Sequence, residues 1–120
     1  MDREIKLSVI IPAYNSGKKI IHCLNALGKN LGYFSKSCRL TYEVLIINDA
    51  GDEINFNFDH GIKNIRGVRI RKNRGVGYVR QLGTRISKYN YIFYLDSDVV
   101  LENENSIKIL FEEFKNHKNV

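Results

Sequence analysis

The chain has 120 residues, of which 43% are hydrophobic and 27% are charged, and its net charge is +6. This length allows one domain over residues 1–120, or part of a larger one, and the apolar fraction is high enough for a packed core, which excludes a disordered chain. No apolar stretch is long enough to span a bilayer, no secretory signal is visible, and the two cysteines lack metal-ligand spacing, so we expect a soluble, cytoplasmic chain with buried thiols.

The first half of the chain predicts a strand, a helix and a second strand. Lys6–Ala13 is rich in β-branched residues and predicts a buried strand. Apolar residues then recur at helical spacing over Ile20–Leu31, and we expect this helix to fade at Gly28 and Gly32. A polar connection follows, and Tyr42–Ile47 predicts a second buried strand.

The second half of the chain continues the alternation of strands and helices. Ile54–Ile65 predicts an irregular connection, with a short helix as the alternative. Val68–Arg71 predicts a short third strand, and Gly75–Lys88 predicts a helix in spite of its glycines. Tyr91–Leu95 predicts a fourth strand, and the apolar spacing within Ile107–Phe114 predicts a last helix.

Continuous apolar strands that alternate with helices indicate the fold class. Strands of this kind are typical of a parallel sheet whose two faces are both covered by helices. We therefore expect an α/β fold with a Rossmann-like, mostly parallel sheet. Right-handed crossovers bring the carboxyl ends of parallel strands to one edge of the sheet, where open α/β folds bind their ligands.

The tripeptide Asp96-Ser97-Asp98 closes the predicted fourth strand. Two carboxylates spaced in this way can both reach one divalent cation. Oxygen ligands suit Mg²⁺ or Mn²⁺, which usually share their coordination with phosphate oxygens. The alternative is a solvated acidic turn after a strand.

Other chemical groups are predicted at the same edge of the sheet. The first strand ends in Pro12–Asn15, the second ends at Asp49, and the glycine-rich segment Asn73–Gly77 leads into a helix that carries Arg80 one turn further on. Carboxylates, an arginine and exposed backbone amides together suit a nucleoside diphosphate held through a metal ion. A dinucleotide fingerprint is absent, because no G-x-G-x-x-G follows the first strand.

Positive charge is concentrated in the second half of the chain. No acidic residue occurs between Gly61 and Leu95, whereas bases are frequent there: Lys63, Arg66, Arg69, Arg71, Lys72, Arg74, Arg80, Arg85 and Lys88. A surface of one sign attracts anions, and the candidates are a nucleotide pyrophosphate, nucleic acid and an acidic membrane surface. The alternative for most of these side chains is a solvated face that keeps the protein soluble.

Four segments in order resemble the family 2 inverting glycosyltransferases of the GT-A fold. Ser8–Asn15 is similar to the opening of that family, and Tyr42–Asp52 is similar to its second strand. Asn73–Gly83 resembles its Asn-x-Gly…Ala-Arg-Asn-x-Gly segment, and Tyr91–Asp98 resembles its Asp-x-Asp strand. Each motif is weak by itself, but the ordered set covers nearly the whole chain.

The resemblance implies a role for each matching residue. The base and ribose pocket of the nucleotide would be lined at the end of the first strand by Pro12, Ala13 and Tyr14. Asp49 would accept hydrogen bonds from the base, which is most often uracil, and Arg80 would lie near the base and the phosphates. Asp96 would face the ribose or the sugar, and Asp98 would bind Mg²⁺ or Mn²⁺. The donor would be a nucleotide-diphosphate sugar, most often a UDP-sugar.

The chain also departs from the family pattern. Asn48 replaces a frequent acid, Ala50 and Gly51 replace Gly-Ser, and Val79 and Gln81 replace alanine and asparagine. A complete domain of the family is longer, and its second half carries the acceptor site and the general base. We therefore expect this chain to bind the donor but not to catalyse alone. The acceptor in a full enzyme would be a glycan, lipid-linked or other hydroxyl, and membrane association is compatible with this family.

Three alternatives belong to other classes. A sugar-phosphate nucleotidyltransferase would need a basic, glycine-rich loop after the first strand, and Pro12–Asn15 is not one. A non-catalytic module could bind anionic lipid or nucleic acid through Lys63–Lys88, but no nucleic-acid-binding motif is present, so we expect no nucleic acid partner. A receiver-type phosphoacceptor domain would need an acidic cluster at the end of the first strand, which is absent.

Overall fold

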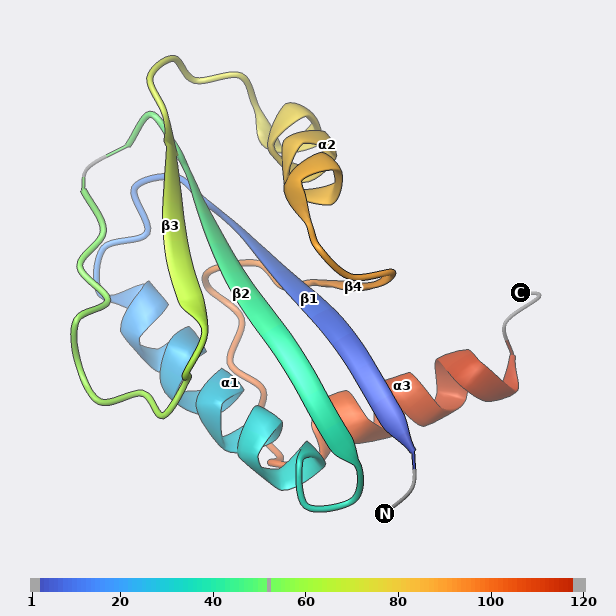
Figure 1. The fold of residues 1–120 in the computed structure, drawn as a ribbon. Coiled ribbons are helices and arrows are strands. Elements are labelled where there is room, and N and C mark those ends of the chain that lie inside the picture. Colours follow the sequence, from blue (N-terminus) through green and yellow to red (C-terminus); the bar gives the residue numbers. More distant parts are fainter. Residues whose placement is uncertain (1–2, 52, 118–120) are drawn as a thin grey trace.

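The computed structural model describes residues 3–51 and 53–117. Four parallel strands form one sheet in the order β3-β2-β1-β4 (Figure 1). Their bounds are Glu4–Ala13 for β1, Arg39–Asp49 for β2, Ile65–Ile70 for β3 and Tyr91–Tyr94 for β4. The predicted parallel α/β fold is confirmed.

Helices cover both faces of the sheet. Helix α1 (Lys19–Phe34) and helix α3 (Ser106–Asn116) pack on one face, where they share the larger core cluster with alternate residues of the strands. Helix α2 (Val76–Ile86) packs on the other face against Ile10 and Ile47 (Figure 1). None of the described helices is both long and apolar enough to cross a membrane.

The two central strands, β1 and β2, are buried on both sides. Their register pairs Ile10 with Leu45 and Ala13 with Asn48, so both strands end at the same level. The backbone amide of Leu95 donates to the carbonyl of Ile10 at 3.0 Å, which extends the pairing of β4 with β1 by one residue. The carboxyl ends of three adjacent strands therefore lie side by side.

Helix α1 does not fade at its glycines, and this prediction is wrong. The helix continues through Gly28 and Gly32 to Phe34, whose side chain is fully buried and prolongs the apolar stripe. A Cβ atom on Gly28 would lie 1.8 Å from the carbonyl oxygen of His60. Gly28 is therefore needed for the close approach of another chain segment, and it does not end the helix.

The connection between β2 and β3 is irregular, as predicted. Its apolar residues, Ile54, Phe56 and Phe58, pack against the core cluster on the α1 side of the sheet. Helix α3 buries only Ile107 and Phe111 of its predicted apolar face, while Leu110 and Phe114 are exposed. Strands β1, β2 and β3 begin earlier than predicted, whereas β4 begins at Tyr91 as predicted. Strand β2 starts at residue 39 because Arg39 pairs with Glu4 at the start of β1.

Candidate functional site at the carboxyl edge of the sheet

The predicted site residues lie at the carboxyl ends of β1, β2 and β4 and on α2, which packs beside these ends (Figure 1). Pro12 and Ala13 are buried within β1, so their side chains are not free to form a pocket wall. Tyr14 is 53% exposed and offers its ring at the edge. Only Tyr14 of these three presents its side chain at the edge.

Asp49 is buried at the end of β2 and anchors the loop that precedes α2. The backbone amide of Arg74 donates to its Oδ1 at 2.9 Å, and the amide of Gly75 donates to its Oδ2 at 3.0 Å. Gly75 has a φ of +86°, a backbone conformation that favours glycine. Each carboxylate oxygen has a second lone pair, so Asp49 can still accept a hydrogen bond from a ligand. This anchoring role is not evident from the sequence.

Arg80 extends from α2 to the end of β4. Its Nη2 lies 3.2 Å from Oδ1 of Asp96, and its guanidinium lies 6.0 Å from the ring centroid of Tyr94. Both members of the ion pair are about half exposed. The predicted arginine and the first predicted carboxylate are thus brought together, with their polar atoms open to solvent.

A tight turn presents the two carboxylates of Asp96 and Asp98. The backbone amide of Val99 donates to the carbonyl of Asp96 at 3.0 Å, which closes the segment Asp96–Val99, here named the carboxylate turn. The side chains of Asp96 and Asp98 are exposed. Ser97, between them, lies with its Oγ 2.7 Å from the Oγ of Ser16 in the loop after β1.

The carboxylate turn rests on the buried thiol of Cys23 in α1. This thiol donates a weak hydrogen bond to the carbonyl of Asp96 at 3.7 Å. Burial, with smaller contributions from the negative charges of Asp98 and Asp96, raises the pKa of the Cys23 thiol to about 12. Cys23 therefore stays protonated and remains a donor at neutral pH.

The loops after β1 and β2 are packed against one another. A Cβ atom on Gly51 would lie 2.7 Å from the backbone nitrogen of Asn15, so only glycine fits there. Asn15 and Ala50 both have positive φ, 50° and 61°. Arg69 of β3 donates from Nη2 to the carbonyl of Gly51 at 3.2 Å and holds this loop from the side. The contribution of Arg69 is not evident from the sequence, and Asp52 lies outside the described residues.

The described residues of the edge form no preassembled metal site. Within residues 3–51 and 53–117, no group of three or more histidine, cysteine, aspartate or glutamate side chains gathers closely enough to hold a metal ion. A Mg²⁺ site, however, commonly uses one or two carboxylates together with water and substrate phosphates. The exposed oxygens of Asp96 and Asp98 fit that donor set, and they do not fit a site made of protein ligands alone.

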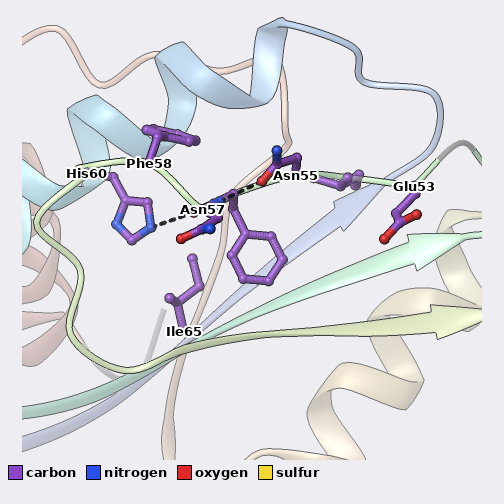
Figure 2. A pocket seen from close by; sticks show the side chains of 8 residues that line it. Glu53, Asn55, Asn57, Phe58, His60 and Ile65 are labelled. Atoms are coloured by element: carbon purple, nitrogen blue, oxygen red, sulfur yellow. Dashed lines mark hydrogen bonds between the residues drawn. The ribbon is translucent and has the colours of Figure 1, made fainter.

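A large hollow of the surface lies elsewhere. It has a volume of about 680 Å³ and is lined by the connection between β2 and β3, from Glu53 to Phe58, with His60 and Ile65 (Figure 2). None of the predicted site residues lines it. Figure 2 shows the His60 ring turned to the backbone of Phe56, whose carbonyl accepts from Nε2 at 3.1 Å, while Nδ1 accepts from the amide of Ile62. These two hydrogen bonds of His60 hold the connection together.

The fold and this edge define an α/β protein that presents carboxylates and an arginine where parallel strands end. The chain belongs to glycosyl transferase family 2, because the model of that family matches residues 8–120. The family match does not favour the nucleotidyltransferase alternative.

Two similar proteins are consistent with membership of this family. The chain is 34% identical over 115 residues to the poly(ribitol-phosphate) beta-N-acetylglucosaminyltransferase TarP of Staphylococcus aureus, covering 88% of this chain and 32% of TarP. It is 26% identical over 103 residues to the dolichyl-phosphate beta-glucosyltransferase of Mus musculus, covering 78% of this chain and 31% of that enzyme. The chain thus spans about a third of the length of these relatives.

A solved structure supports the fold. The chain resembles the crystal structure of residues 1–349 of S. aureus TarS with a TM-score of 0.73 and 24% identity, covering 95% of this chain and 33% of that TarS segment. The same TarS segment in complex with UDP-GlcNAc matches with a TM-score of 0.72. At this identity the likeness establishes the GT-A-type fold.

Proposed function

We propose that this chain is the donor-binding part of a glycosyltransferase. The enzyme would transfer a sugar from a nucleotide-diphosphate sugar to an acceptor hydroxyl with inversion. The observation that carries the proposal is the pairing of Arg80 with Asp96 at the carboxyl edge of a sheet, in a chain that belongs to glycosyl transferase family 2. The UDP-GlcNAc complex of the similar TarS structure supports a UDP-sugar as the donor.

The proposed contacts follow from exposure and charge. The ring of Tyr14 is exposed beside the two packed loops and stacks on the base or the ribose. The second lone pairs of Asp49 accept from the base. Arg80 forms an ion pair with Asp96 of the carboxylate turn, so it binds a phosphate oxygen, while Asp96 accepts from a hydroxyl of the ribose or the sugar. Pro12 and Ala13 contribute through their backbone, since their side chains are buried.

Asp98, assisted by Asp96, would hold Mg²⁺ or Mn²⁺ together with the diphosphate oxygens of the donor. When bound, such an ion supplies Lewis-acid stabilisation of the negative charge on the departing diphosphate. The residues of this chain orient the donor beside that ion. Arg80 adds a fixed positive charge near the same phosphates. The turn packs on the buried Cys23, which keeps water away from one side of the site.

The acceptor side is proposed to lie outside this chain. Inversion needs a general base on the face opposite the leaving group. The glutamates after the carboxylate turn, Glu102 and Glu104, are exposed to solvent. We therefore propose that donor binding is the function of this chain, and that the remaining two thirds of the length of its relatives correspond to the acceptor-binding part. The acceptor is a hydroxyl of a glycan, a lipid-linked sugar or a polyol.

Calorimetric titration tests the proposal. UDP, GDP and a short DNA duplex are titrated into the 120-residue chain with and without Mn²⁺. We expect UDP to bind with Mn²⁺ and to lose this cation-dependent binding in Asp98→Ala, whereas Glu102→Ala, which removes an exposed carboxylate nearby, binds as the wild type does. Tight binding of the DNA duplex that Asp98→Ala leaves unchanged, without UDP binding, would overturn the proposal.

A further inference from the structure

Two serine hydroxyls connect the carboxylate turn to the loop after β1. The Oγ atoms of Ser16 and Ser97 lie 2.7 Å apart, a full hydrogen bond in which either hydroxyl donates. Ser16 is 8% exposed and precedes the first turn of α1, while Ser97 is the central residue of the turn and is partly buried. The bond joins residues 81 positions apart in the chain.

The neighbouring contacts hold the backbone of the turn, but not its orientation toward the loop after β1. The amide of Val99 and the thiol of Cys23 both donate to the carbonyl of Asp96. These bonds act at the first residue of the turn. The Ser97 hydroxyl acts at its middle, directly between the two residues whose carboxylates are exposed.

We propose that Ser16 and Ser97 form a positioning pair for metal-dependent donor binding. The pair holds the turn so that the carboxylates of Asp96 and Asp98 face the diphosphate of a nucleotide whose base lies by the loop after β1. This inference rests on the proposed function. It adds that the base-binding loop and the metal-binding turn are joined by one partly buried hydrogen bond.

The physical reason for the effect of the pair on binding is the conformational entropy that is lost when the turn becomes ordered. A metal site requires its carboxylates to be held close to the binding geometry before the cation arrives. Without the serine bond, binding would have to order the backbone at Ser97, which opposes binding. We expect the loss of one hydroxyl to reduce the gain in UDP affinity caused by Mn²⁺ by about threefold to tenfold, the range for one hydrogen bond. Binding of uridine, which has no phosphate, should stay within about twofold, since no phosphate-bound metal contributes to it.

A double-mutant cycle tests this pair. UDP with and without Mn²⁺, and uridine alone, are titrated into the wild-type chain, Ser16→Ala, Ser97→Ala and the double variant. We expect each single substitution to reduce the Mn²⁺-dependent gain in UDP affinity by the factor given above. The double variant should lose no more of this gain than the worse single variant, because both substitutions remove the same hydrogen bond. Ser97→Thr keeps the hydroxyl and should retain most of the gain.

Ser35→Ala serves as the matched control, because its hydroxyl bonds the carbonyl of Gly32 at the far end of α1. Thermal unfolding of every variant shows whether a loss of binding comes from a general loss of stability. If Ser97→Ala does not fold, the titrations of Ser16→Ala and Ser97→Thr test the pair. A Mn²⁺-dependent gain that survives in Ser97→Ala, or losses that add in the double variant, would overturn the pair alone. Absence of any Mn²⁺-dependent gain in the wild-type chain would overturn the proposed function and the pair with it.

Discussion

Arg80 and Asp96 form an ion pair between helix α2 and the end of β4, with 3.2 Å between Nη2 and Oδ1. The two side chains are 45% and 56% exposed. An exposed pair of this kind contributes only about 0–1 kcal/mol to stability, because solvent screens both charges. Its consequence is local: the pair keeps a positive charge beside the carboxylate turn.

Arg80→Ala should weaken UDP binding much more than it weakens the fold. We expect a loss of affinity of about tenfold to a hundredfold in the presence of Mn²⁺, since a charge-assisted hydrogen bond to phosphate contributes about 1.5–3 kcal/mol. Arg85→Ala removes an equally exposed arginine from the same helix and should change affinity less than about twofold. Calorimetry measures both variants, and equal losses in the two would show that only the general positive charge of α2 matters.

Asp49→Ala should release the loop before α2. The substitution removes the acceptor of two backbone amides, Arg74 and Gly75, and should lower the free energy of unfolding by about 2–4 kcal/mol. Urea denaturation measures this change, and hydrogen exchange should show faster exchange at the two amides. Asp59→Ala, which removes an exposed carboxylate, should change stability by less than about 0.5 kcal/mol. Unchanged exchange at Arg74 and Gly75 in Asp49→Ala would contradict the anchoring role.

The two glycines of α1 should respond in opposite directions to alanine. Gly28→Ala would place a methyl group against the carbonyl of His60 and should destabilise the protein by about 1–3 kcal/mol. Gly32→Ala meets no atom within 4 Å and should stabilise it by about 0.4–1 kcal/mol through the helix propensity of alanine. Thermal and urea unfolding measure both. Equal stabilisation by the two substitutions would mean that residues 53–62 do not pack on α1 as described.

The thiols of Cys23 and Cys38 should be unreactive in the folded protein. Burial raises the pKa of both thiols, that of Cys23 to about 12, so very little nucleophilic thiolate is present at pH 8. We expect modification by a thiol-specific disulfide reagent to be at least about a hundredfold slower than in the urea-unfolded chain. The absorbance of the released thiolate follows the reaction. Rapid modification of Cys23 at pH 8 without unfolding would contradict its place beneath the carboxylate turn.

The type and order of the elements could be predicted because each carries its own periodicity. Lys6–Ala13 and Tyr42–Ile47 are short segments rich in apolar and β-branched residues, which favours strands buried on both faces. The boundaries were less predictable. Helix α1 passes Gly28 because the space beside it is occupied by another segment, and β2 begins at Arg39 because the start of β1 is there to pair with it.

A buried carboxylate within a predicted apolar strand is another feature whose contacts could not be predicted from the sequence. Glu43 lies in β2 and is 2% exposed. Its Oε2 accepts from the hydroxyl of Ser8 at 2.7 Å and from the backbone amide of Lys88 at 2.6 Å, and so fixes the loop between α2 and β4. Nothing in the periodicity of β2 indicates these partners, because they come from distant parts of the chain.

The sequence by itself determined that strand ends carrying carboxylates, and a helix carrying Arg80, belong to one edge of a parallel sheet. Periodicity and chain order are local properties of the sequence. The right-handed crossovers between parallel strands then place the strand ends at one edge of the sheet. The tertiary structure alone decided which atoms meet: Arg80 with Asp96, Asp49 with the amides before α2, and Ser16 with Ser97. Such contacts need distances of about 3 Å between residues far apart in the chain, and only the packing of the helices on the sheet determines them.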